Sequence, residues 1–148
     1  MPYACTHASS GVIGDQLVVA GGYCSEGNAL LRLQIYDIGS RTWRLGTAPP
    51  HGNYDRWGVV VDGKLLLLAQ YGLMSVYDPH SDSWTFEEVD RACIVNACVH
   101  EGRMIGFSRR TGYIDQFERA TDGSWSPSSC GVDTSGLQDF VSESVILG

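Results

Sequence analysis

Three side chains in the second half of the chain have the chemical types that a metal ion would need. Cys93, Cys98 and His100 form a C-x4-C-x-H pattern, and thiolate and imidazole groups are the usual ligands of zinc. The pattern lacks a clear fourth ligand. Cysteines an odd number of residues apart on one strand also point to opposite faces of a sheet. We therefore expect no metal and no cofactor, and we interpret these cysteines as buried apolar side chains.

The chain offers no recognisable catalytic motif. The nucleophile elbow G-x-S-x-G, the phosphate loops G-x-G-x-x-G and G-x-x-x-x-G-K-[ST], and the zinc motif H-E-x-x-H are all absent from the sequence. The four histidines fall in or near expected turns or strand ends: His7, His51, His80 and His100. A catalytic histidine needs a partner acid or nucleophile, and no such pairing can be read from the sequence. We therefore expect no catalytic residue and no enzymatic activity.

Composition and charge narrow the classes of partner. The 148 residues carry a net charge of −7, which argues against nucleic-acid and anionic-membrane binding because phosphate contacts need clustered Lys and Arg. The start of the chain, MPYACTHASSGV, does not resemble a signal peptide, and the apolar run LLLLA (65–69) is too short to span a bilayer. The five cysteines are scattered and odd in number, and no N-x-[ST] sequon is present. We expect a cytoplasmic or nuclear protein with reduced thiols.

One pattern occurs three times along the chain. The segments IYDIGSRTW (35–43), VYDPHSDSW (76–84) and QFERATDGSW (116–125) each combine an aromatic residue, an acidic residue, a polar turn and a tryptophan. The tryptophans Trp43, Trp84 and Trp125 are separated by equal intervals. A regular period of about 40 to 50 residues is the sequence sign of a repeat architecture.

Each repeat is predicted to contain four antiparallel strands. The second strands are short apolar runs that each follow a Gly-containing turn: GDQLVVAGG (14–22), GKLLLLAQ (63–70) and GRMIGFSR (102–109). The first strands precede these turns: SSGVI (9–13), RWGVVV (56–61) and NACVH (96–100). The third strands follow: LRLQIYD (31–37), LMSVYD (73–78) and YIDQFE (113–118). A fourth, short strand begins at each tryptophan. Tight turns at 14–15, 62–63 and 101–102 join the first two strands of each set.

These repeats predict an all-β chain built as part of a β-propeller, with about three four-stranded antiparallel blades. One blade cannot bury both of its faces alone, so blades must stack. We expect the first blade at about 5–48, the second at about 54–88 and the third at about 92–128, with the tail 129–148 starting a further blade or closing the sheet. Two alternatives remain: a β-sandwich with chance similarity among its strands, and a helix over 86–100, where Glu87 and Arg91 have helical i,i+4 spacing.

The repeated residues resemble kelch repeats. The marks of that family are a Gly-Gly pair that ends the second strand, then Tyr-Asp, then Trp about six residues later. The first repeat matches in full, with Gly21, Gly22, Tyr36, Asp37 and Trp43. The second matches at Tyr77, Asp78 and Trp84, but has Ala69-Gln70 in the glycine positions. The third has Ser108-Arg109 in those positions, followed by Phe117, Glu118 and Trp125. The phrases VYDPHSDSW and GTAPP are similar to the kelch domains of plant-type F-box/kelch proteins.

The resemblance implies a non-catalytic protein–protein interaction module. If a longer parent chain carries an F-box, it implies recognition of a protein or peptide substrate for a ubiquitin ligase. The alternative within the same fold is a galactose-oxidase-like or epimerase-like enzyme acting on a sugar or an alcohol. Two alternatives follow from the number of blades: either the chain is a fragment of a longer protein, or it completes its propeller as a homodimer, since two three-blade arcs add up to six blades.

In kelch domains the loops between second and third strands, and those that link blades, make the partner contacts. Carried onto this sequence, the loops are 23–30, 71–72 and 109–112, with 49–56 and 87–93 as the linking class. The candidate partner-binding residues are Tyr23, Tyr54, Arg56, Tyr71, Arg109 and Arg110, whose types dominate interface energetics. Arg56 also matches a family arginine that could be structural. Arg109 and Arg110 could bind an acidic peptide, or form an ordinary solvated turn.

Overall fold

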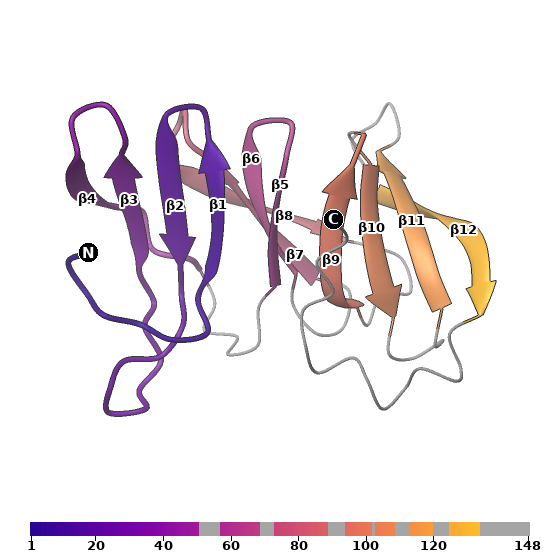
Figure 1. Cartoon of the computed structure of the whole chain (residues 1–148), viewed down its shortest axis with the longest axis horizontal. Coiled ribbons are helices and arrows are strands. Elements are labelled where there is room, and N and C mark those ends of the chain that lie inside the picture. The colour runs from indigo at the N-terminus through magenta and orange to yellow at the C-terminus, as the bar shows by residue number, and fades with distance from the viewer. Residues whose placement is uncertain are drawn as a thin grey trace.

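The computed structural model describes residues 1–50, 57–68, 73–88, 94–101, 103–108, 113–119 and 125–133. Within these residues the chain is all-β, and its strands form three four-stranded antiparallel sheets in chain order (Figure 1). The first sheet contains β1 (Ser9–Ile13), β2 (Gln16–Ala20), β3 (Leu33–Asp37) and β4 (Thr42–Gly46). The second contains β5 (Trp57–Val61), β6 (Lys64–Leu68), β7 (Leu73–Asp78) and β8 (Ser83–Glu88). The third contains β9 (Ile94–His100), β10 (Arg103–Ser108), β11 (Tyr113–Arg119) and β12 (Trp125–Asp133). The prediction of an all-β chain with three four-stranded antiparallel blades is confirmed.

The tight turns between first and second strands use residues that tolerate positive φ. Asp62 and Gly63 have φ of 51° and 70°, as a type I′ turn requires at both of its central residues. Gly14 and Glu101 open the equivalent turns of the other two sheets, with φ of 55° and 50°. The predicted turn positions are therefore those at which the chain reverses.

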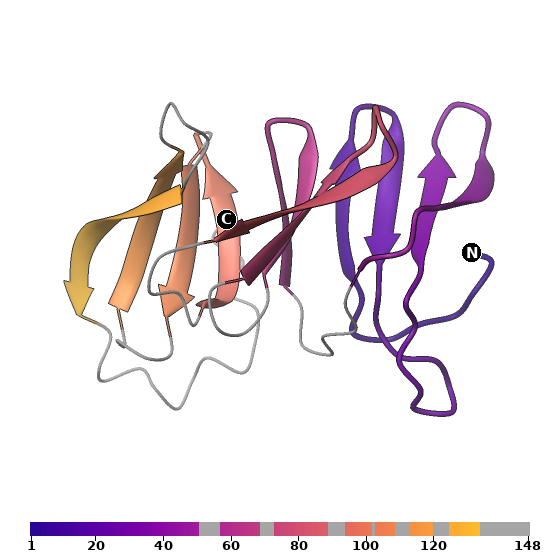
Figure 2. The ribbon, with the colours of Figure 1, turned by 180° about the vertical axis from the view of Figure 1, so that it is seen from behind.

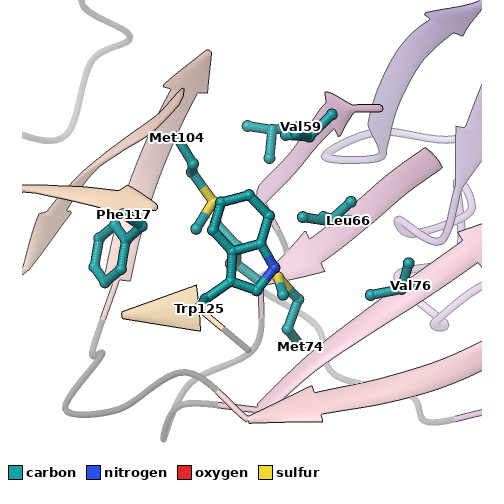
Figure 3. Close-up of a cluster of buried hydrophobic side chains, with 9 residues drawn as sticks. Val59, Leu66, Met74, Val76, Met104, Phe117 and Trp125 are labelled. Atoms are coloured by element: carbon teal, nitrogen blue, oxygen red, sulfur yellow. The ribbon is translucent and has the colours of Figure 1, made fainter. Parts of the chain in front are cut away.

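The second sheet is buried on both faces, which explains its run of four leucines. Leu65 and Leu67 pack against the first sheet, whereas Leu66 and Leu68 pack against the third. Alternate residues of a strand point to opposite faces, so a strand covered on both sides has apolar residues at every position. Figure 3 shows the second of these clusters, in which Val59, Leu66, Met74 and Val76 meet Met104, Phe117 and Trp125.

The three sheets stand in a row, and their first strands are neighbours. β1 lies against β5, and β5 lies against β9 (Figures 1 and 2). Gly11 makes the first of these approaches possible, because a Cβ atom at this position would lie 2.3 Å from Cγ2 of Val60. The first strands are thus the inner strands of a partial propeller. The β-sandwich alternative is wrong, because a sandwich has two facing sheets and this chain stacks three.

Two further expectations are changed by the strand positions. The helix considered over 86–100 is wrong where the structure describes it, since β8 extends to Glu88 and β9 begins at Ile94. β12 extends to Asp133, so Ser129, Val132 and Asp133 pair with β11 beyond the expected end of the third blade. The rest of the tail, 134–148, lies outside the described residues. The described part of the chain contains no helix that is long and apolar enough to cross a membrane.

Candidate functional site

The repeated aromatic residues form cross-strand pairs in the first two blades. Tyr36 is directly opposite Trp43, and Tyr77 is directly opposite Trp84. The ring centroids are 5.0 Å apart in the first pair and 5.2 Å in the second, with the same interplanar angle of 43°. We call the face that carries the Tyr–Trp pair the front face of a sheet, and the opposite face its back face. The front face of the second sheet packs on the back face of the first.

The acidic residue of the first two motifs fixes the turn that follows it. Oδ1 of Asp37 accepts hydrogen bonds from the backbone N–H and the hydroxyl of Ser40, at 2.6 and 2.7 Å. Asp78 accepts the backbone N–H of His80 at 2.9 Å and pairs with Lys64 at 3.1 Å. These hydrogen bonds favour the charged form and hold the pKa of both carboxyl groups below the usual aspartate value. The Tyr-Asp motif therefore has a structural role in the first two blades.

A polar contact fastens the end of β4 to the outer turn of the second sheet. The Asp82 carboxylate accepts the Tyr77 hydroxyl at 2.6 Å and the backbone N–H and hydroxyl of Thr47 at 3.1 and 3.2 Å. The Trp84 indole donates to the Thr47 carbonyl at 2.8 Å. Burial, together with the Asp82 carboxylate, raises the pKa of Tyr77 to about 12. The Tyr77 hydroxyl in turn lowers the pKa of Asp82.

A second contact of the same kind joins the second and third sheets. The Glu87 carboxylate, near the end of β8, accepts the Trp125 indole N–H and an Arg119 guanidinium N–H, both at 2.9 Å. Arg119 also lies 3.9 Å from Asp62. At both junctions, therefore, the motif tryptophan donates to a residue at the end of the preceding sheet's fourth strand. We call these two contacts the outer junctions.

The loop between β2 and β3, residues 21–32, is the described member of the predicted partner-binding loops. It is held on one side by the N-terminal segment, because Thr6 and Tyr23 exchange both backbone hydrogen bonds at 2.9 Å. Gly22 has φ of 88°, and a Cβ atom there would lie 2.5 Å from the Thr6 carbonyl oxygen. Only glycine fits this approach. The family's Gly-Gly pair is therefore needed to seat the loop against the N-terminal segment.

Tyr23 is the one predicted partner-binding residue that the described part of the chain includes. It is half-buried, bridges Thr6 and Ala29, and its ring meets His7 edge-on at 6.3 Å. The other predicted residues, Tyr54, Arg56, Tyr71, Arg109 and Arg110, lie outside the described residues. Their roles stay predictions.

Sequence reasoning missed Arg32, the last residue of this loop, and Gln34, which follows it in β3. The Arg32 guanidinium stacks 4.1 Å from the centroid of the Tyr3 ring, and the backbone of Tyr3 pairs with the Gln34 side chain at 2.8 and 3.0 Å. Gln34 is only 1 % exposed. No local pattern marks these residues, because their partners lie about thirty positions away in the chain.

The possible metal ligands do not gather in the described part of the chain. Cys98 is exposed, so the expectation of a buried cysteine at this position is wrong. The His100 side chain, which follows on the same strand, is exposed as well, and Cys93 lies outside the described residues. Among the residues that the structure describes, no three His, Cys, Asp or Glu side chains are placed to hold a metal ion.

Comparison with known proteins agrees with the three-sheet architecture. A family model described as the kelch motif matches residues 4–50, which span the first sheet. Kelch-like protein 23 of Mus musculus is 28% identical over 123 residues, which cover 76% of this chain and 22% of that protein. The same protein of Homo sapiens and of Pongo abelii is 27% identical over the same length. The chain thus spans about a fifth of the length of these curated relatives. The chain therefore carries a kelch motif in its first sheet, and its three four-stranded blades, with a cross-strand Tyr–Trp pair in the first two, are similar to kelch repeats.

Proposed function

We propose that the chain is a non-catalytic protein-interaction module that holds a protein or peptide partner with the loops at one end of its sheets. The observation that carries this proposal is the build of the 21–32 loop. Its backbone is fastened to Thr6 and to itself by hydrogen bonds, while residues 25–28, Leu31 and Arg32 remain exposed. A loop that is already ordered loses little conformational entropy when it binds, which favours its use as a contact surface.

The two ends of the sheets differ in what they offer to a partner. The end with the turns 14–15 and 62–63 presents two-residue connections. The opposite end has the 21–32 loop, together with the ends at which the second strands, β2, β6 and β10, leave their sheets (Figure 1). Longer connections present more side chains and more backbone groups than tight turns do. We therefore assign the partner to the end that carries the 21–32 loop, and call it the loop end.

An acidic peptide or acidic protein segment is the partner that the charges favour. Arg109 and Arg110 follow β10 directly in the sequence, and Arg32 is exposed in the 21–32 loop. Arginine binds carboxylates with paired, charge-assisted hydrogen bonds. Under this proposal, the double variant Arg109→Glu, Arg110→Glu loses capture of the partner.

The matched control is the double variant Lys64→Glu, Arg103→Glu. It changes the net charge by the same amount as the Arg109, Arg110 variant. Its two residues, however, directly follow the two-residue turns between first and second strands. Partner capture by affinity purification should be kept by the control and lost by the Arg109, Arg110 variant, with both retaining the circular dichroism of the parent chain. Equal capture by all three proteins would contradict the proposed role of the loop end. Stoichiometric copper or iron in the purified chain, with turnover of a sugar or an alcohol, would contradict the non-catalytic role.

The adaptor role of the wider family is a finer part of the proposal. If a longer parent protein carries an F-box, the partner held at the loop end is a substrate for ubiquitination in the cytoplasm or nucleus. Co-purification of ubiquitin-ligase components with such a parent protein would support this role. A parent protein that captures its partner without any ligase component would contradict it.

A further inference from the structure

The N-terminal segment and the 21–32 loop continue the β1–β2 ladder beyond the ends of its two strands. Inside the ladder, Ser9 is opposite Ala20. An antiparallel bridge then joins Thr6 to Tyr23, each three residues further from the ladder along its own segment. Equal steps along the two segments therefore keep the same register, and the N-terminal segment runs beside the loop as an extension of β1.

One step further out, this register places two cysteines opposite each other. Cys5 directly precedes Thr6, and Cys24 directly follows Tyr23. Thr6 and Tyr23 exchange both backbone hydrogen bonds, so the next pair is of the non-hydrogen-bonded type, in which the Cα atoms are about 4.5 Å apart. A disulfide spans Cα separations of about 4.4–6.8 Å. The backbone therefore already holds the two cysteines at a separation that a disulfide can span.

The backbone hydrogen bonds of Cys24 agree with this pairing. Its N–H donates to the Asn28 carbonyl, and its carbonyl accepts the Gly27 N–H, both at 2.9 Å. Both groups therefore point away from the N-terminal segment, as a non-hydrogen-bonded position requires. In such a pair the two side chains lie on the same face of the ladder, with Cβ atoms about 4.5–5.5 Å apart. The thiols of Cys5 and Cys24 thus leave the backbone on the same side.

The two thiols differ in their surroundings. The structure contains both as free, half-buried thiols. The Cys5 sulfur lies 3.9 Å from Nε2 of Gln34, so its side chain must turn from this amide toward Cys24 for a bond to form. Burial raises the pKa of the Cys5 thiol, which leaves less of it as thiolate, the reactive form. Cys24 adjoins the exposed residues 25–28, which makes it the more accessible of the two to a small oxidant.

We propose that Cys5 and Cys24 form an oxidation site, at which hydrogen peroxide joins the two thiols in an intramolecular disulfide between the N-terminal segment and the 21–32 loop. The peroxide oxidises the Cys24 sulfur to a sulfenic acid, its O–O bond breaks, and its other oxygen leaves as water. The Cys5 sulfur then attacks the Cys24 sulfur, the S–S bond forms, and the S–O bond breaks to release the second water. One peroxide thus removes the two thiol hydrogens. A dithiol reductant reverses the reaction by thiol–disulfide exchange, as befits a compartment that normally keeps thiols reduced.

The disulfide adds a covalent bond at a place where backbone hydrogen bonds alone hold the loop in the reduced chain. The amides of Thr6 and Tyr23 donate across this part of the ladder. They should exchange with deuterium more slowly in the oxidised chain than in the reduced chain, because local opening is restricted. The proposal goes beyond the interaction role at the loop end, and it is tested on the chain alone. A failure of partner capture therefore leaves it untouched.

Mass spectrometry of the 148-residue chain after treatment with hydrogen peroxide tests the proposal. Arg32 is the first Lys or Arg in the chain, so trypsin releases both cysteines in the single peptide 1–32. Free thiols are blocked with a maleimide before digestion. After oxidation this peptide should carry no maleimide and lack two hydrogen atoms, and after dithiothreitol it should carry two maleimides. Cys5→Ser and Cys24→Ser should each abolish the loss of hydrogen, and dimedone should label the sulfenic acid of Cys24 in the Cys5→Ser chain.

Equilibration with mixtures of reduced and oxidised glutathione shows whether the fold, rather than the short separation along the chain, pairs the thiols. The effective concentration of one thiol at the other should be at least about tenfold higher in the folded chain than in urea. Gly22→Ala, whose Cβ would lie 2.5 Å from the Thr6 carbonyl oxygen, should lower it several-fold. Gly14→Ala is the matched control, since Gly14 also has a positive φ but nothing lies within 4 Å of a Cβ there. This control should keep the value of the parent chain.

A peptide 1–32 that keeps two maleimides after peroxide, or that carries sulfinic or sulfonic acids without a disulfide, would overturn the proposal. Preferential pairing of Cys5 or Cys24 with Cys98 would overturn the choice of partners. Stronger dimedone labelling of Cys5 in the Cys24→Ser chain than of Cys24 in the Cys5→Ser chain would overturn the order of the two steps. If Gly22→Ala fails to fold, the comparison in urea still decides, because equal effective concentrations in the folded and unfolded chains exclude a pair prepared by the fold.

Discussion

Removing the carboxylate of Asp82 should destabilise the junction between the first and second sheets. Tyr77 is fully buried, and its hydroxyl donates to Asp82 at 2.6 Å. Without this acceptor the hydroxyl remains buried and unpaired, which costs about 1–3 kcal/mol. The two hydrogen bonds from Thr47 are partly exposed and add about 0.5–1 kcal/mol together. The expected loss in the free energy of unfolding is therefore about 1.5–4 kcal/mol.

Glycine is the right replacement for this measurement. Asp82 has φ of 46°, a conformation that alanine adopts only with strain, so Asp82→Ala would mix a backbone cost with the loss of the side chain. Asp82→Gly removes the side chain and keeps the backbone relaxed. Asp82→Asn keeps one acceptor oxygen and tolerates the same φ, so it should lose only about 1 kcal/mol.

Equilibrium unfolding in urea gives the assay, and Tyr77→Phe completes a double-mutant cycle. With the hydroxyl gone there is no buried donor to leave unpaired, so Asp82→Gly in the Tyr77→Phe background should cost only about 1 kcal/mol. The coupling between the two residues should then be about 1–3 kcal/mol. A loss below about 0.5 kcal/mol for Asp82→Gly, or strictly additive single changes, would refute the reasoning.

Four further predictions follow from the packing and the shifted pKa values. Gly11→Ala should lower the free energy of unfolding by about 1–3 kcal/mol in urea, because its Cβ would overlap Val60; an unchanged midpoint would contradict the close approach of β1 and β5. Leu66→Ala should cost about 2–5 kcal/mol, since Leu66 is a buried part of the cluster between the second and third sheets; a loss below about 1 kcal/mol would contradict that burial. Stability from Tyr77, whose pKa is raised to about 12, should be complete below pH about 10 and fall as the pH rises toward 12, a decline that Tyr77→Phe should lack. Stability from Asp82, whose pKa is lowered, should be present above pH about 4 and fall as the pH decreases further, and an identical acid profile for Asp82→Asn would contradict this.

The strands could be predicted because the same local sequence pattern occurs in each of the three repeats. Strand residues alternate between faces, turns need Gly or Asp at positive φ, and tryptophans at equal intervals fix the period. The run 65–68 reads as a fully buried strand, and the structure supplies the reason, since sheets cover both of its faces. The third blade was expected to end at about 128, because the following Ser129 and Gly131 do not favour strands, whereas β12 extends to Asp133.

The contacts between sheets could not be predicted from the sequence, because the residues that they join do not have equivalent positions in the repeats. Glu87 has Arg91 at helical spacing in the sequence, yet its carboxylate binds Arg119 and Trp125. Asp82 and Thr47 are joined across 35 positions. Gln34 is a polar residue in a strand, and only the folded chain shows that Tyr3 satisfies its amide. Such pairs depend on how one sheet is set against the next.

The measurement that tests the interaction role most directly is hydrogen–deuterium exchange of the chain, free and bound to its captured partner. The account predicts slower exchange in the 21–32 loop, with Cys24, Gly27 and Leu30 among the reporting amides. It also predicts slower exchange in the sequence between β10 and β11, and unchanged exchange at the turns 14–15 and 62–63. Protection confined to those turns, or no protection in the presence of a saturating partner, would contradict the assignment of the partner to the loop end.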